Sequence, residues 1–214
     1  MKIVGIDLSG PRNIADTFVT LFEEKQDKLH LSETIAGADD QKILAAIAGL
    51  GSGEAVVIGV DAPLSYNPGG GDRKSDQELR RQVAIRGGRV GVMTPTMTRM
   101  VYLTLHGIAL ARILEALKPD VNLRIVEVHP GACMLLRGAT VKDVDGFKRD
   151  PRARLNLLSW LDEQGLKGLP RSKNIADHFV ASCAAALAAW QGSLGSAVWE
   201  YPAEMPYHPY AFVC

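Results

Sequence analysis

The chain of 214 residues is poor in cysteine and has no excess of charge of either sign. Its three cysteines, Cys133, Cys183 and Cys214, are far apart and form no C-x-x-C pair, which argues against a disulfide framework or a zinc knuckle. Lysine and arginine number 24, and aspartate and glutamate also number 24, so a surface that is basic on every side is excluded. Any nucleic-acid site must therefore be local.

Long hydrophobic runs are also lacking. The apolar run at the N-terminus ends at Asp7, which leaves no room for a signal-peptide core. The longest nearly uncharged stretch, residues 179–190, is shorter than the roughly 18 to 20 residues that span a bilayer. We therefore expect a cytoplasmic protein without a membrane partner, in a reducing compartment that suits unpaired cysteines.

What is present is typical of a globular α/β chain. Hydrophobic residues make up 47% and charged residues 22%, and no low-complexity linker or internal repeat divides the sequence, so a single domain over residues 1–214 is expected. The patterns predict strands over residues 2–8, 17–23, 28–35, 55–60 and 122–128. A first helix is expected after a cap at Asp39 or Asp40, with its apolar positions between residues 43 and 50, and is stopped by Gly51 and Gly53. Further helices are predicted over 75–86, with Ser75 as the cap, and over 98–118, 150–164 and 174–191, before a mostly irregular tail from residue 199. Three hairpin-linked strands followed by parallel strands favour an RNase H-like mixed sheet flanked by helices over a Rossmann fold.

Acidic residues stand where buried strands end. Asp7, Asp61 and Glu127 each follow an apolar run, and Asp177 opens an alanine-rich helix. A buried carboxylate costs several kcal/mol unless it is paired or bound to metal, and strand ends in an α/β sheet face one crevice. Four converging acids would repel one another unless divalent cations neutralised them, and oxygen ligands favour Mg²⁺ or Mn²⁺. These four residues are therefore predicted to be catalytic and metal-binding. Any one of them alone is equally compatible with a turn or a helix cap.

A family resemblance rests on several short motifs spread over nearly the whole chain. They are Val4-Gly5-Ile6-Asp7, Val60-Asp61-Ala62-Pro63-Leu64, the glycine loop 69–71 followed by Arg73, Asp76 and Arg80, Glu127-Val128-His129-Pro130, and the helix after Asp177. In these residues the chain resembles a domain-of-unknown-function family of predicted nucleases with an RNase H fold. The resemblance implies that fold and a metal-dependent phosphodiesterase activity. RuvC-like resolvases, more distant relatives by fold, carry Asp-x-x-Asp at the last helix, whereas this chain has Asn174 at the first position, which weakens a second metal site.

Basic residues gather in two segments that flank the predicted acids. Residues 72–112 hold eight basic and three acidic side chains, and residues 137–154 hold six basic and three acidic ones. From these segments we predict that DNA or RNA phosphates contact Arg73, Arg80, Arg81, Lys148 and Arg154. Solvated helix faces are the alternative for any single arginine. His178 and Asn174 are expected beside the metal ligands without binding the metal themselves.

Three functions remain open at this point. The first is a nuclease in which Asp7, Asp61, Glu127 and Asp177 bind Mg²⁺ or Mn²⁺ and cleave phosphodiester bonds. The second is an actin-like ATP-binding domain, because the Asp7-Leu8-Ser9-Gly10 turn resembles a sugar-kinase phosphate loop. The third is an inactive nucleic-acid-binding module of the same fold. A serine hydrolase has no support, because Ser65 and Ser9 lack a histidine partner at a recognisable spacing.

Overall fold

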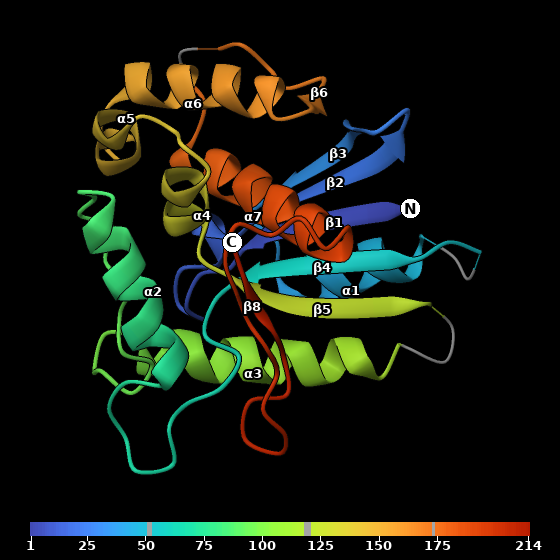
Figure 1. The fold of residues 1–214 in the computed structure, drawn as a ribbon. Coiled ribbons are helices and arrows are strands. Elements are labelled where there is room, and N and C mark those ends of the chain that lie inside the picture. The colour runs from blue at the N-terminus through green and yellow to red at the C-terminus, as the bar shows by residue number, and fades with distance from the viewer. Residues whose placement is uncertain (51–52, 118–120, 173) are drawn as a thin grey trace.

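A single mixed sheet organises the protein. The computed structural model describes residues 1–50, 53–117, 121–172 and 174–214, and within them eight strands form a sheet in the order β6-β3-β2-β1-β4-β5-β8-β7 (Figure 1). The strands are β1 (Lys2–Asp7), β2 (Phe18–Lys25), β3 (Lys28–Ala36), β4 (Val56–Asp61), β5 (Leu123–Val128), β6 (Leu166–Lys167), β7 (Glu200–Tyr201) and β8 (Phe212–Val213). The predicted mixed α/β architecture is confirmed.

The central strands carry the predicted pairing. β1, β2 and β3 form an antiparallel meander, and β4 and β5 then add parallel strands on the other side of β1. Each parallel strand is a nearly continuous apolar run because both of its faces are covered. The register sets Asp7 directly opposite Asp61 at the carboxyl ends of β1 and β4. The position of the two acids is thus decided by the parallel pairing of their strands.

Helices cover both faces of the sheet. They are α1 (Asp40–Ala48), α2 (Lys74–Ile85), α3 (Val101–Glu115), α4 (Pro130–Leu136), α5 (Val141–Gly146), α6 (Pro151–Glu163) and α7 (Asp177–Ser193), with a short 3-10 turn at Ile14–Asp16. One apolar cluster joins α1 and α3 to the sheet, and a second joins α4, α6 and α7 to its opposite face. None of the helices in the described residues is long and apolar enough to cross a bilayer.

Close packing of α7 sets the position of the helix start. A Cβ added at Gly5 would lie 1.9 Å from the backbone oxygen of Ser182, and one at Gly59 would lie 2.5 Å from that of Ala185. Glycine in two neighbouring strands and alanine along the helix therefore let the α7 backbone approach the sheet. This approach carries Asp177, in the first turn of α7, to the ends of β1 and β4.

Several predicted boundaries were wrong. The cap of α2 is at Arg73 and not at Ser75, because the Asp76 carboxylate accepts the Arg73 backbone N–H. α3 begins at Val101, after a turn over residues 98–100, and its predicted end at residue 118 lies outside the described residues. The short helices α4 and α5 and the strands β6, β7 and β8 were not predicted. The tail after residue 199 is mostly irregular, as predicted, apart from β7 and from β8, which pairs with β5.

Candidate active site

A cavity of about 840 Å³ opens at the carboxyl ends of β1, β4 and β5. It is bounded by the loop after β1, the segment between α2 and α3, the turn between α5 and α6, and the first turn of α7. All four predicted acids line it: Asp7, Asp61, Glu127 and Asp177. The structure therefore brings these acids, which are far apart in the sequence, to one place.

Asp7 and Asp61 form a hydrogen-bonded carboxyl pair. Burial raises the pKa of Asp7, although the hydrogen bond from His178 works against this rise. Burial raises the pKa of Asp61 well above its ordinary value, and the charge of the neighbouring Asp7 raises it further. Both carboxyls of the pair are thus harder to ionise than a solvated carboxyl. Asp7 in turn faces His178.

His178 connects the carboxyl pair to the start of α7. Its Nδ1 lies 2.7 Å from Oδ2 of Asp7, and its Nε2 lies 3.8 Å from Asp16 and 4.0 Å from Asp177. The sequence prediction placed His178 beside the acids, and the structure puts it in contact with one of them. Asp177 does not cap α7, because the N-cap residue is Ala176. Asn174 is exposed and does not line the cavity.

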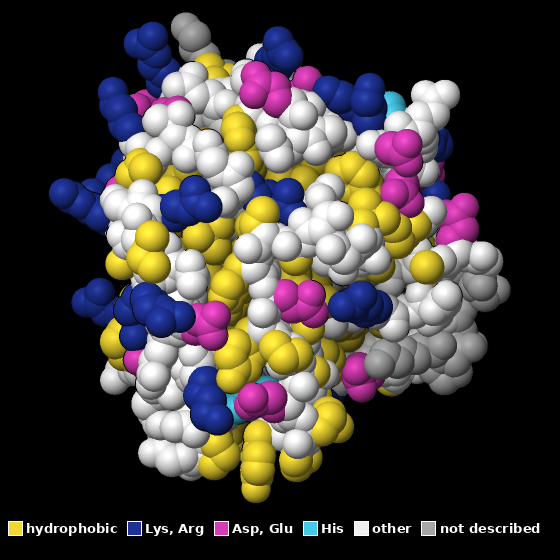
Figure 2. Space-filling view, viewed as in Figure 1, with side chains coloured by type: hydrophobic (Ala, Val, Ile, Leu, Met, Phe, Trp, Pro, Cys, Tyr) yellow, Lys and Arg dark blue, Asp and Glu magenta, His cyan; other side chains and the backbone are white. Residues whose placement is uncertain are grey.

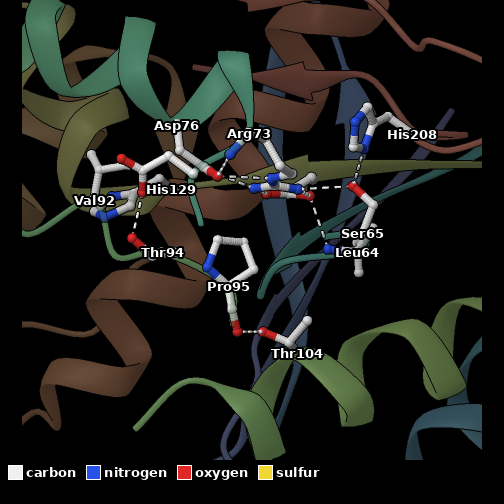
Figure 3. Close-up of polar contacts among 12 residues, drawn as sticks. Leu64, Ser65, Arg73, Asp76, Val92, Thr94, Pro95, Thr104, His129 and His208 are labelled. Carbon is white, nitrogen blue, oxygen red and sulfur yellow. Dashed lines mark hydrogen bonds and ion pairs between the residues drawn. The ribbon is translucent and has the colours of Figure 1, made fainter. Parts of the chain in front are cut away.

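Glu127 is engaged by a buried arginine. Its Oε1 lies 2.5 Å from Nη2 of Arg73, its Oε2 lies 2.7 Å from Nη1, and Oε2 also accepts the backbone N–H of Leu64 at 2.8 Å (Figure 3). Arg73 contacts Asp76 in the same way, with Nε at 3.0 Å and Nη2 at 2.6 Å. A guanidinium group therefore supplies the counter-charge that the sequence analysis assigned to a metal ion at Glu127.

The place of Arg73 differs from its predicted role as a phosphate contact. The side chain is 5% exposed, and its five N–H donors go to Glu127, Asp76 and Ser65. Burial disfavours the charged guanidinium, but the Glu127 carboxylate more than compensates and raises the pKa of Arg73. No donor of Arg73 is left for a nucleic-acid phosphate in this arrangement.

The roles of Ser65 and His208, which lie beside Arg73, were not found from the sequence. Ser65 receives a hydrogen bond from Arg73 at 3.0 Å, and its hydroxyl lies 2.9 Å from Nδ1 of His208, which is 143 residues further along the chain (Figure 3). Ser65 therefore has the histidine partner that its spacing did not reveal. The space beside this pair is only about 10 Å³, too small for a substrate. Both residues position Arg73.

The basic residues divide into paired and free ones. Arg80 pairs with Asp72 at 2.7 Å, Arg154 donates to the Phe147 backbone oxygen at 2.9 Å, and exposed Arg81 does not line the cavity. Lys148 does line it, as do Arg89 and Arg149, which the prediction left out although they belong to the same basic segments. The side chains of Lys148, Arg89 and Arg149 make no hydrogen bond or ion pair with the described residues. On the face shown in Figure 2, Lys and Arg gather toward the side of α2, α5 and α6.

The carboxylates that line the cavity fit a divalent cation at one position only. Within the described ranges no group of three or more His, Cys, Asp or Glu side chains is close enough to hold a metal ion. Asp7 and Asp61 still offer adjacent carboxylate oxygens whose repulsion a cation would relieve. The carboxylates of Asp7 and Asp61 fit Mg²⁺ or Mn²⁺, and Asp177 lines the same cavity. Glu127 does not fit the metal ion, because Arg73 already binds its carboxylate.

Two histidines of the cavity are expected to titrate on opposite sides of the ordinary value of about 6.5. The hydrogen bond to Asp7 raises the pKa of His178, whereas burial lowers the pKa of His129, whose ring also caps α4. NMR titration of the imidazole signals in a chelating buffer measures both midpoints. Asp7→Asn should lower the midpoint of His178 and leave that of His129 in place. A His178 midpoint at or below that of His129 would contradict the described contact.

Comparison with known proteins gives one family. A family model described as a protein of unknown function (DUF429) matches residues 5–206. No curated protein and no solved structure matches the chain. The matched range includes the motifs from Asp7 to Asp177 that line the cavity.

Proposed function

Because the chain belongs to DUF429, a family of proteins of unknown function, we propose its activity from the cavity itself: it is a metal-dependent nuclease that hydrolyses phosphodiester bonds. The observation that carries this proposal is the Asp7 and Asp61 pair, set in register on adjacent parallel strands and facing a cavity with unpaired cations. Carboxylates that bind metal and cations that bind phosphate are the two components that such hydrolysis requires.

The topology supports an RNase H-like assignment. The consecutive part of the sheet, β3-β2-β1-β4-β5, places β1 between an antiparallel and a parallel neighbour. This is the arrangement expected for an antiparallel meander that continues into parallel strands. The first acid then follows the central strand, and the second follows the parallel strand beside it.

Each residue at the cavity has its own role in the proposed reaction. Asp7 and Asp61 would hold Mg²⁺ or Mn²⁺, which supplies a polarised phosphate and an activated water when it is bound. His178 orients Asp7 through its 2.7 Å contact. Arg73 fixes the Glu127 carboxylate, which in turn accepts the backbone N–H of Leu64. Lys148, Arg89 and Arg149 attract the phosphate backbone of the substrate.

One structural observation favours each of the two alternative functions. The ion pair of Glu127 with Arg73 favours an inactive nucleic-acid-binding module, because it withdraws one predicted ligand. The loop after β1 lines the cavity with Ser9, Gly10 and Asn13, as an actin-like phosphate loop would. Both alternatives make predictions that differ from those of the nuclease.

Cleavage of labelled single-stranded and duplex DNA and RNA, with Mg²⁺, Mn²⁺ or chelator, tests the proposal. We expect metal-dependent cleavage by the wild type and a loss of about 100-fold or more in Asp7→Asn, the range over which one catalytic group acts. Asp162→Asn is the matched control, because Asp162 pairs with Lys167 outside the cavity. Calorimetry with Mn²⁺ provides a second readout. Absence of both cleavage and Mn²⁺ binding would refute the nuclease, and metal-dependent stabilisation by ATP would favour the actin-like alternative.

A further inference from the structure

One wall of the cavity is apolar. The segment from residue 92 to residue 103 contributes only Val92, Met93, Met100 and Leu103 to the lining. Met93 is 37% exposed, although methionine is usually buried in a folded protein. An apolar wall serves neither a metal ion nor a phosphate group. It therefore indicates a substrate with a flat, weakly polar part.

Another wall is basic and reaches the carboxyl pair. The backbone N–H of Arg89 donates to Asp145 at 2.9 Å, which joins the segment after α2 to α5, and Lys148 and Arg149 follow α5 directly. Asp145 is the acidic residue on this wall. The charge of Lys148 acts on both Asp7 and Asp61. A phosphate held by Lys148 would therefore lie near the carboxyl pair.

The size of the cavity limits what can occupy it. A volume of about 840 Å³ is within the range of roughly 300 to 1,000 Å³ that encloses one small organic molecule. A stacked duplex presents its sugar-phosphate backbone outward and keeps its base faces covered. A base can reach an apolar pocket only after leaving the stack, and this costs least in a single strand.

We propose that the cavity receives one unstacked nucleotide of a single-stranded nucleic acid. Its base lies against Met93, Met100 and Leu103, and its phosphate lies at Lys148, Arg89 and Arg149. The proposal rests on the proposed function for the reaction, but the binding it describes can be measured without metal. Base contact of this kind is sequence-tolerant, because every base has an apolar face.

The wild-type protein tests the strand preference in a chelating buffer. Fluorescence anisotropy compares a short single-stranded oligonucleotide with the same oligonucleotide annealed to its complement. We expect the single strand to bind about tenfold more tightly or better, because the duplex must first unpair. Equal affinity for the two forms would overturn the proposal, and this experiment does not depend on any variant.

Two variants test the apolar wall and the basic wall of the cavity separately. Calorimetry measures the affinity of the protein for adenosine monophosphate and for inorganic phosphate in the same buffer. Met93→Gln, which keeps the length of the side chain without adding a charge, should weaken binding of the nucleotide by about tenfold, the scale of one lost apolar contact in a pocket, and leave binding of inorganic phosphate nearly unchanged. Lys148→Met should weaken both ligands. Their controls are Met205→Gln and Lys142→Met, because Met205 and Lys142 are exposed and do not line the cavity.

The outcomes distinguish this proposal from the nuclease itself. Nucleotide binding that is unaffected by Met93→Gln, or equally affected by Met205→Gln, would refute the assignment of the base. Single-strand and nucleotide binding without any metal-dependent cleavage and without Mn²⁺ binding would support the proposed ligand and refute the nuclease. Cleavage of duplex as rapidly as single strand would support the nuclease and refute the unstacked nucleotide.

Discussion

Replacement of Arg73 by methionine is expected to lower the free energy of unfolding by about 3 to 5 kcal/mol, the usual cost of removing one partner from a buried ion pair. Arg73, Asp76 and Glu127 are all buried, and the guanidinium is bonded to both carboxylates. Methionine fills a similar volume, but it leaves two buried acids without their cation and Ser65 without a donor. The same change in a solvated pair would have little effect.

Urea unfolding of Arg73→Met and of the control Arg80→Met measures this difference. Arg80 also forms a bidentate pair, with Asp72, but its side chain is 44% exposed, so we expect a loss of at most about 1 kcal/mol. The double variant Arg73→Met with Glu127→Met should recover part of the lost stability, because one buried charge is then removed. Equal and small losses in the two single variants would contradict the buried ion-pair network.

Asp61→Asn is expected to stabilise the metal-free protein at neutral and alkaline pH while it abolishes metal-dependent cleavage. Burial raises the pKa of Asp61, so the folded protein binds a proton more tightly than the unfolded chain does. The stability that this proton provides is complete below the unfolded pKa of about 3.9 and is lost as pH rises through the folded pKa. Each unit by which the pKa is raised corresponds to about 1.4 kcal/mol. Asparagine keeps a donor toward Asp7 and never ionises.

Thermal or urea unfolding from pH 5 to pH 9 in a chelating buffer checks this prediction. The variant Asp61→Asn should exceed the wild type in free energy of unfolding by an amount that grows with pH. Added Mg²⁺ should stabilise the wild type but not the variant. Asp162→Asn, which alters a solvated pair with Lys167, should follow the wild type at every pH. A variant that is less stable than the wild type at pH 8 would mean that the Asp61 carboxylate is needed by the fold.

The elements that position the site could be predicted from local pattern. β1, β4 and β5 are apolar runs that each end at or near an acid, and their predicted limits differ from the observed ones by one residue or less at each end. The short elements α4, α5, β7 and β8 were missed, because a few residues carry no measurable periodicity. β8 is a strand because β5 offers it a free edge, and residues far from it in the sequence provide that edge.

The partners of the acids could not be predicted in the same way. A glutamate in a buried strand needs a counter-charge, but the pattern does not distinguish a metal ion from an arginine. The structure selects Arg73 for Glu127, 54 residues away, and His178 for Asp7, 171 residues away. Among the residues that the structure describes, the side chains of Lys148, Arg89 and Arg149 have no hydrogen-bond or ion-pair partner at the cavity, whereas Arg80 pairs with Asp72 and Arg154 donates to the Phe147 backbone oxygen.

The sequence by itself determined the order of the longer strands and helices, the acids at the strand ends and the basic segments beside them. These features depend on hydrophobic pattern and turn chemistry within a few neighbouring residues. Only the tertiary structure decided that Asp7 pairs with Asp61, that Arg73 neutralises Glu127, and that apolar and basic residues line the same cavity. Charge pairing and cavity shape depend on contacts between residues that only the packing of α7 and the tail against the sheet brings together.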